Sequence, residues 1–232
     1  MSATMRCGLY GKLPAKRDFI AIGTTREFLA MWEAFMQGGV SASLLSLGTH
    51  WRGAFLTAPI WRFWLGAELC GATTLGAFMP SLDGIGRYFP LTVFVQAEEG
   101  GALAPPELNS QIEFFEAAEE FLLSTLEEGT SFEATTAALQ SLRLPLDRSP
   151  PLRPGATFLS DGSLLLRAGD TPFADMFALA REAGHAQAYA ASSFWWTAGG
   201  EGYPALALAK RRMPDPNVFT GMLTGNFESL GG

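Results

Sequence analysis

Gly11 and Lys12 are the first residues along the chain whose types and spacing suggest chemistry, because they follow a short apolar run. A Gly-Lys pair after a strand is typical of loops that bind phosphate groups. Such a loop also needs a glycine at position 6, where Arg6 stands, and a Ser or Thr after the lysine, where Leu13 stands. The sequence therefore argues against a phosphate-binding loop. Gly11 more simply allows the backbone to turn closely.

A second polar segment, residues 80–91, lies between two apolar runs. It contains Ser81, Asp83 and Arg87, with glycines at the turn. We consider two interpretations. The segment is either a tight loop held by an Asp83–Arg87 pair, or a ligand-binding loop, because side chains on a rigid connection between strands are well placed to bind.

Charged residues of these two segments are expected to meet in the folded protein. A partly buried charge needs a partner, so we expect Asp18, Asp83 and Arg87 to lie close together. With Lys12 and Ser81 they would form a polar pocket. This pocket supports an alternative class of function, a small-ligand sensor or a hydrolase.

The sequence contains few residues in patterns that would support other catalytic chemistry. His50 and His185 are the only histidines and neither lies in a motif, so a triad that includes Ser81 has no support. The sequence contains no His-x-x-x-His, no Cys-x-x-Cys and no carboxylates with calcium-loop spacing. We therefore predict no catalytic residue, no metal site and no cofactor.

The composition limits the partners and the compartment. The chain has 232 residues and a net charge of -7, and an acidic chain repels phosphate backbones, so nucleic acid is not an expected partner. Cys7 and Cys70 lack the spacing of a disulfide framework and indicate a reducing compartment. Neither a signal peptide nor an apolar run of about 18 residues is visible. The sequence predicts a cytoplasmic protein that does not span a membrane.

Three segments have the apolar spacing of helices. The first is expected to begin at a capping box formed by Thr24 and Glu27 and to end at Gly38 and Gly39. A second helix is predicted from a Ser110 cap, and a third over residues 131–142 from a Thr130 cap. The first helix should bury an aromatic face made of Phe28, Trp32 and Phe35.

The second predicted helix has two contrasting faces. Its apolar positions are Ile112, Phe115, Ala118, Leu122 and Leu126. The opposite face carries the acidic residues Glu113, Glu116, Glu120 and Glu127. This acidic face is either an ordinary solvated surface or a docking surface for a basic partner.

Short apolar runs rich in aromatic and β-branched residues predict eight strands. They lie near residues 5–10, 60–65, 74–78, 89–95, 157–159, 164–167, 193–197 and 205–209. Because few helices separate them, the pattern predicts an α+β fold with a mixed, mainly antiparallel sheet and helices packed on it. Proline-rich residues 144–154 could form a linker, but we expect the C-terminal part to complete the same sheet, which gives a single domain over residues 1–232.

Tryptophan and phenylalanine gather in two clusters. They are Trp51, Trp61, Phe63 and Trp64 in the first, and Phe194, Trp195 and Trp196 in the second. Such residues are usually core, although a tryptophan at a partly exposed edge is also a common interface anchor.

Four segments, in order along the chain, resemble the TagF (ImpM) family of accessory proteins of the bacterial type VI secretion system. They are Gly8-Leu9-Tyr10-Gly11-Lys12-Leu13-Pro14 with Asp18-Phe19, Ala58-Pro59-Ile60-Trp61-Arg62-Phe63, Pro80-Ser81 with Asp83 and Gly86-Arg87-Tyr88-Phe89-Pro90-Leu91, and Trp195-Trp196-Thr197. Lys16 and Arg17 depart from the family, which usually has Arg-Gly before Asp18, so no role is carried over to them.

The resemblance implies a cytoplasmic, non-enzymatic regulator that represses type VI secretion after translation. The expected partner is the forkhead-associated scaffold protein of that system. The residues expected to form a binding or structural cluster are Lys12, Asp18, Trp61, Arg62, Ser81, Asp83 and Arg87.

Overall fold

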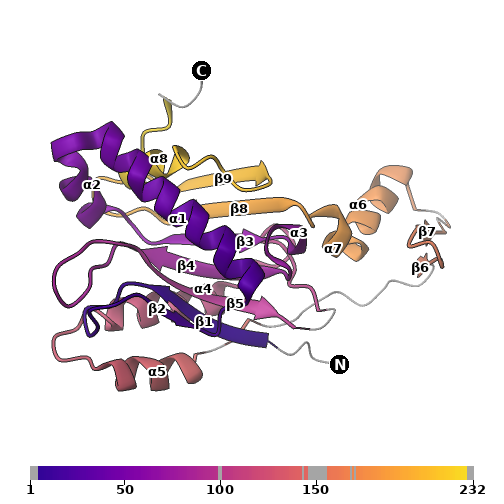
Figure 1. Cartoon of the computed structure of the whole chain (residues 1–232). Coiled ribbons are helices and arrows are strands. Elements are labelled where there is room, and N and C mark those ends of the chain that lie inside the picture. Colours follow the sequence, from indigo (N-terminus) through magenta and orange to yellow (C-terminus); the bar gives the residue numbers. More distant parts are fainter. Residues whose placement is uncertain are drawn as a thin grey trace.

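A seven-stranded sheet forms the centre of the computed structural model, which describes residues 5–98, 101–142, 144–145, 156–167, 169 and 171–228 (Figure 1). Its strands are β1 (Met5–Gly11), β2 (Ile20–Ile22), β3 (Trp61–Leu65), β4 (Thr74–Met79), β5 (Leu91–Ala97), β8 (Ser192–Thr197) and β9 (Leu206–Arg211). The strand order is β2-β1-β5-β4-β3-β8-β9, and all neighbours are antiparallel. The predicted α+β fold with a mainly antiparallel sheet is confirmed.

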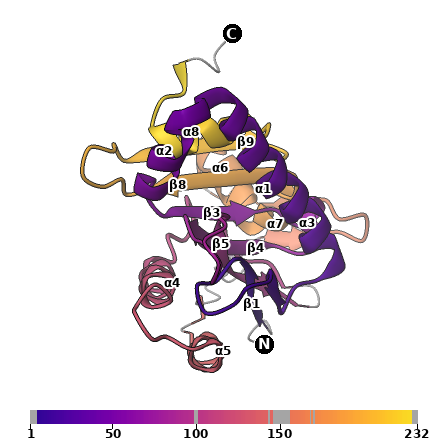
Figure 2. The same cartoon turned by 60° about the vertical axis from the view of Figure 1, so that its left-hand side comes forward.

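Helices pack on both faces of this sheet (Figures 1 and 2). One face carries α1 (Arg26–Leu47), α2 (Trp51–Thr57), α3 (Ala67–Cys70) and α8 (Val218–Thr224), with the 3-10 turn Gly48–His50 between α1 and α2. The other face carries α4 (Ile112–Ser124) and α5 (Phe132–Gln140). In the part of the chain described, no helix is long and apolar enough to cross a membrane.

The alternation of side chains along each strand produces two separate cores. Trp61 and Phe63 of β3 point to the α1 face, whereas Trp64, the next residue after Phe63, points to the α4 face. On β5, Phe94 packs under α1 and Val93 packs under α4. The two-residue period of the apolar pattern therefore fixes which helices each strand residue meets.

Helix α1 differs from the prediction at both ends. Its N-cap is Thr25 and not Thr24, because Thr25 Oγ1 accepts a hydrogen bond from the Phe28 N–H at 3.3 Å. The prediction that Gly38 and Gly39 end the helix is wrong, since it continues to Leu47. A Cβ on Gly39 would lie 2.8 Å from the Phe219 side chain. These glycines therefore allow α8 to pack closely and do not stop the helix.

Helix α4 begins later than predicted, and its buried face is rotated. The N-cap is Gln111, whose φ is 49°, so the capping box expected at Ser110 is not formed. Ile112 and Leu126, predicted to be core, are 55% and 48% exposed. The buried face consists of Phe114, Phe115, Ala118, Phe121 and Leu122. This face is favoured because it buries three phenylalanine rings against the sheet.

The third predicted helix, α5, also starts one residue late. Ser131 Oγ, rather than Thr130, accepts the capping hydrogen bond, from the Ala134 N–H at 3.1 Å. The adjacent hydroxyl Thr130 Oγ1 instead donates to Ser124 O at 3.1 Å, which ties the loop to the end of α4.

The C-terminal part completes the central sheet through β8 and β9, as predicted. The strands β6 (Ala156–Phe158) and β7 (Leu164–Leu166) form a separate hairpin and do not join the central sheet. The sequence patterns missed β2 and the helices α2, α3, α6 (Phe173–Ala183), α7 (His185–Ala188) and α8. No residue of α6 is buried, although its apolar residues Phe173, Met176 and Phe177 recur at helical spacing, a pattern that the prediction did not use.

Buried tryptophans anchor the cores through their indole N–H groups. The bonds run from Trp32 to Thr92 Oγ1, from Trp51 to Ser43 Oγ, from Trp61 to the Met222 carbonyl and from Trp64 to the Leu103 carbonyl. Trp195 is also fully buried, but its N–H has no partner within the described residues. The expectation that the two aromatic clusters belong to the core is met by all of their residues except Phe194 and Trp196, which are partly buried.

Gly8 gives a direct test of this packing. It pairs with Phe94 across β1 and β5, and a Cβ at Gly8 would collide with the Phe94 ring, which itself packs 4.1 Å from the Phe28 ring, centroid to centroid. We expect Gly8→Ala to lower the free energy of unfolding by about 1–3 kcal/mol through overpacking. Urea denaturation measures this value.

The matched control is Gly53→Ala in α2, where an added Cβ meets no atom within 4 Å. It should be neutral or stabilise the protein by up to about 1 kcal/mol, since alanine favours the helix. Equal effects of the two substitutions would contradict the packing role of Gly8.

Candidate functional site

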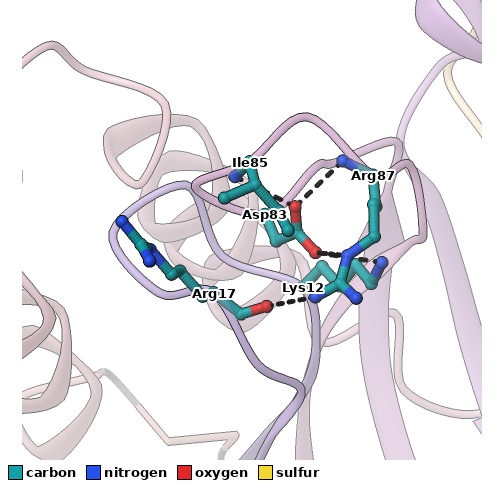
Figure 3. Close-up of polar contacts among 5 residues, drawn as sticks. All are labelled: Lys12, Arg17, Asp83, Ile85 and Arg87. Atoms are coloured by element: carbon teal, nitrogen blue, oxygen red, sulfur yellow. Dashed lines mark hydrogen bonds and ion pairs between the residues drawn. The ribbon is translucent and has the colours of Figure 1, made fainter.

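The carboxylate of Asp83 joins the two polar segments at one end of the sheet (Figure 3). Its Oδ2 lies 3.1 Å from Lys12 Nζ and accepts a hydrogen bond from Arg87 Nε at 2.7 Å. Its Oδ1 accepts from the backbone N–H groups of Ile85, at 3.1 Å, and Arg87, at 2.9 Å. We call Lys12, Asp83 and Arg87 the Asp83 latch.

The latch depends on the tight connection between β4 and β5. Leu82 and Tyr88 form a bridge across this connection, and the Gly86 N–H donates to the Asp83 carbonyl at 2.9 Å. Gly86 has a φ of 84°, a conformation that favours glycine and closes the turn. The backbone therefore brings Arg87 back beside Asp83, four residues earlier in the chain.

Backbone contacts dock this connection onto the segment that follows β1. The Gly84 N–H donates to the Lys16 carbonyl at 2.7 Å, and Arg87 Nη2 donates to the Arg17 carbonyl at 2.5 Å. Arg87 thus bridges both segments, as Figure 3 shows. The two motifs meet in the folded chain, but through Lys12 and the Arg17 carbonyl and not through the predicted Asp18.

The environment of Asp83 strongly favours its charged form. Burial of this fully enclosed side chain raises the carboxyl pKa, but the hydrogen bonds from Arg87, Lys12 and the Ile85 N–H outweigh burial and hold the pKa well below its ordinary value. Lys12 is also buried, whereas the Arg87 side chain is 55% exposed. Asp83 and Lys12 therefore form the enclosed part of the latch and Arg87 its outer part.

Asp18 does not take part as predicted. It is exposed, and its carboxylate forms no hydrogen bond or ion pair with any residue that the structure describes. The backbone carbonyl of its neighbour Arg17 contacts Arg87 instead, because that carbonyl faces the latch. Ser81 is buried, as a member of the polar group should be, but its Oγ has no partner among the described residues.

The other predicted site residues lie apart from the latch. Trp61 points into the core under α1, and Arg62 points to the opposite face of β3. Arg62 Nε lies 2.5 Å from Glu119 Oε1 and its guanidinium lies over the Phe115 ring. The sequence did not identify Glu119 as a partner of Arg62, because the two residues are brought together only by the packing of α4 on the sheet.

The acidic residues of the second predicted helix are all exposed. Glu113, Glu116 and Glu120 lie on α4, and Glu127 lies just beyond its last residue. Exposure of all four glutamates is expected both for an ordinary solvated surface and for a surface that docks a basic partner. The buried face of α4 is formed by other residues, so these charges are not needed to hold the helix on the sheet.

The chemistry available to this site is limited. Both oxygens of Asp83 already accept two hydrogen bonds each, so the carboxylate is held as an acceptor for its own loop. Burial raises the pKa of Cys7 and of Cys70 to about 11, which leaves both thiols protonated at neutral pH. Within the residues that the structure describes, no three His, Cys, Asp or Glu side chains gather to hold a metal ion.

The protein is therefore an α+β protein in which charged motif residues hold the segment after β1 against the connection between β4 and β5. The chain belongs to the TagF family of type VI secretion system-associated proteins, because the model of the TagF N-terminal domain matches residues 8–142. These residues contain the latch and helices α4 and α5. The resemblance drawn from the sequence motifs is therefore confirmed.

A solved structure extends this relationship over the C-terminal part. The crystal structure of PA0076 from Pseudomonas aeruginosa PAO1 is 31% identical to the chain, with a TM-score of 0.71. The match covers 95% of this chain and 94% of PA0076. A comparison with curated proteins gave no significant match.

The two cations of the latch should contribute unequally to stability. We expect Lys12→Met to lower the free energy of unfolding by about 2 kcal/mol, because it removes a buried charged donor. Arg87→Ala should cost less than about 1 kcal/mol, because the arginine is half exposed. Urea denaturation of both variants measures the difference.

Lys210→Met is the matched control for the lysine substitution, since Lys210 is exposed and forms no ion pair with a described residue. It should change stability little. A larger loss for Arg87→Ala than for Lys12→Met would contradict the assignment of Lys12 to the enclosed part of the latch.

The low pKa of Asp83 predicts acid sensitivity. A pKa lower in the folded than in the unfolded state contributes stability above the unfolded value, near pH 4, and loses it as the pH falls below that value. The stability difference between wild type and Asp83→Asn should thus be constant from about pH 5 to pH 8 and shrink below about pH 4. Denaturation at several pH values tests this, with Asp18→Asn as the exposed control.

Proposed function

We propose that this protein represses type VI secretion after translation by binding a cytoplasmic regulatory component, the forkhead-associated scaffold. The observation that carries the proposal is membership of the TagF family, whose N-terminal domain model matches residues 8–142. The protein acts without catalysis. In support, each charge of the Asp83 latch has a partner within the fold, and both cysteine thiols stay protonated.

The exposed glutamates support recognition of a protein. Glu116 and Glu120 stand one turn apart on the outer side of α4, Glu113 lies in its first turn, and Glu127 lies in the turn that follows the helix. Exposed charges of one sign speed up association with an oppositely charged partner and add little to affinity. In this proposal the acidic face sets the association rate, and an apolar surface supplies most of the binding energy.

The alternative is a small-ligand sensor or hydrolase that uses Lys12, Asp18, Ser81, Asp83 and Arg87. It is less well supported because the exposed Asp18 stands outside the latch. The buried Ser81 hydroxyl, which has no partner in the described residues, is the one feature in its favour. Hydrolysis would need a base beside that hydroxyl, and Asp83 is already committed to four hydrogen bonds.

A genetic and a biochemical measurement test the proposal together. Deleting the gene in its native host should raise secretion through the type VI apparatus at unchanged transcript levels. Purified protein should bind the purified scaffold in a pull-down and in a titration. Complementation with the wild-type gene is the control and should restore repression.

Two results would contradict the proposal. Unchanged secretion in the deletion strain would show that the protein does not repress type VI secretion. Turnover of a small substrate by the pure protein, abolished by Ser81→Ala, would favour the enzyme instead.

A further inference from the structure

Strand β9 forms one edge of the central sheet. It pairs with β8 alone among the described strands, so the backbone groups on its outer side lack a strand partner. The opposite edge, β2, is only three residues long, whereas β9 has six. A long open edge is a ready template for a further strand.

An apolar groove lies beside this edge, on the face that carries α4. It has a volume of about 580 Å3. Helix α4 packs mainly on β4 and β5. Its Phe115 ring also meets Trp196 of β8, with 4.8 Å between the ring centroids, and the groove lies beyond this contact, toward β9. The main side chains around the groove are Phe194, Trp196, Ala207, Ala209 and Ile112.

The groove arises because large residues of β8 stand opposite small residues of β9. Trp196 pairs with Ala207, and Phe194 pairs with Ala209, across β8 and β9. The two aromatic side chains are partly buried and the two alanines are exposed. Alanine methyl groups cannot fill the space beside the larger rings, so alternate side chains of an added strand would find apolar pockets there.

Positive charge gathers at the end of β9. Lys210, Arg211 and Arg212 are consecutive and exposed, and none forms an ion pair with a described residue. Arg212 has a φ of 72°, a conformation that an arginine rarely adopts. The Ala191 carbonyl, which accepts from its N–H at 2.5 Å, and Ser193 Oγ, which donates to its carbonyl at 2.7 Å, hold it there. Strained residues of this kind often mark binding surfaces.

We propose that β9 and the groove form a docking surface for an extended segment of a partner protein, apolar at alternate positions and acidic at one end. The segment adds to the sheet along β9, where main-chain hydrogen bonds give affinity. Its apolar side chains enter the groove between Trp196 and Ala207, and its acidic end lies against residues 210–212. The inference deepens the proposed function, because we assign the segment to the same partner, but its test does not need the scaffold.

The experiment selects binders from a displayed library of short random peptides with the full chain as bait. Selected peptides should alternate apolar residues and carry Asp or Glu at one end. Their affinity for Ala207→Arg should fall at least tenfold, since a long charged side chain would fill the groove. Fluorescence anisotropy measures these affinities.

Ala21→Arg is the matched control, because Ala21 is an exposed alanine on the other edge strand, β2. It should bind the peptides like wild type. Lys210→Glu should weaken binding, and the difference from wild type should shrink at high salt. Amide hydrogen exchange provides a second measurement, in which peptide should protect residues 206–211 and leave residues 20–22 unchanged.

Three outcomes would overturn the inference. Peptides could bind Ala207→Arg as tightly as wild type, or protection could fall outside β9. Sedimentation could also reveal a dimer that Ala207→Arg dissolves, which would make a second copy the occupant of the edge. If peptides dock at β9 while the scaffold fails to bind the wild-type chain, the docking surface stands and the proposed function falls.

Discussion

Burial of the central strands on both faces is the constraint on which the rest of the structure depends. Every residue of β4 and β5 is buried, so polar side chains on these strands must find partners inside the protein. Gln96 Nε2 donates to Thr74 Oγ1 at 3.0 Å, and Gln96 Oε1 accepts from Thr25 Oγ1 at 3.2 Å. Because Thr25 also caps α1, this chain of bonds fixes the start of the longest helix against the middle of the sheet.

The Asp83 latch meets the same constraint where the buried strands end. The chain must reverse direction between β4 and β5 at the edge of the core, where backbone N–H groups lose their strand partners. The Asp83 carboxylate accepts from two of these groups, and Lys12 and Arg87 balance its charge. Motif residues that look catalytic in the sequence thus have partners that close a turn and attach it to β1.

The two halves of the sheet differ in how far helices cover them. On the face of α4, the strands β1, β5 and β4 lie under α4 and α5, whereas β8 and β9 border an open apolar groove. A surface of this kind excludes less water than a closed core, so its apolar residues remain available to a partner. The sheet therefore separates a part that secures the fold from a part that we assign to recognition.

Local patterns in the sequence determined every described strand except β2, the fold class and the Asp83–Arg87 pair, because strand alternation and a four-residue separation act over short distances along the chain. The family motifs likewise identified Lys12, Asp83 and Arg87, which the fold brings together. Only the tertiary structure decided the longer-range features. Lys12 meets Asp83 from 71 positions away, Gly39 continues a helix because Phe219 packs on it, and Asp18 turns to solvent while its neighbour's carbonyl contacts Arg87. Each of these outcomes depends on which distant parts of the chain pack together. The residues next to each position in the sequence do not determine that packing.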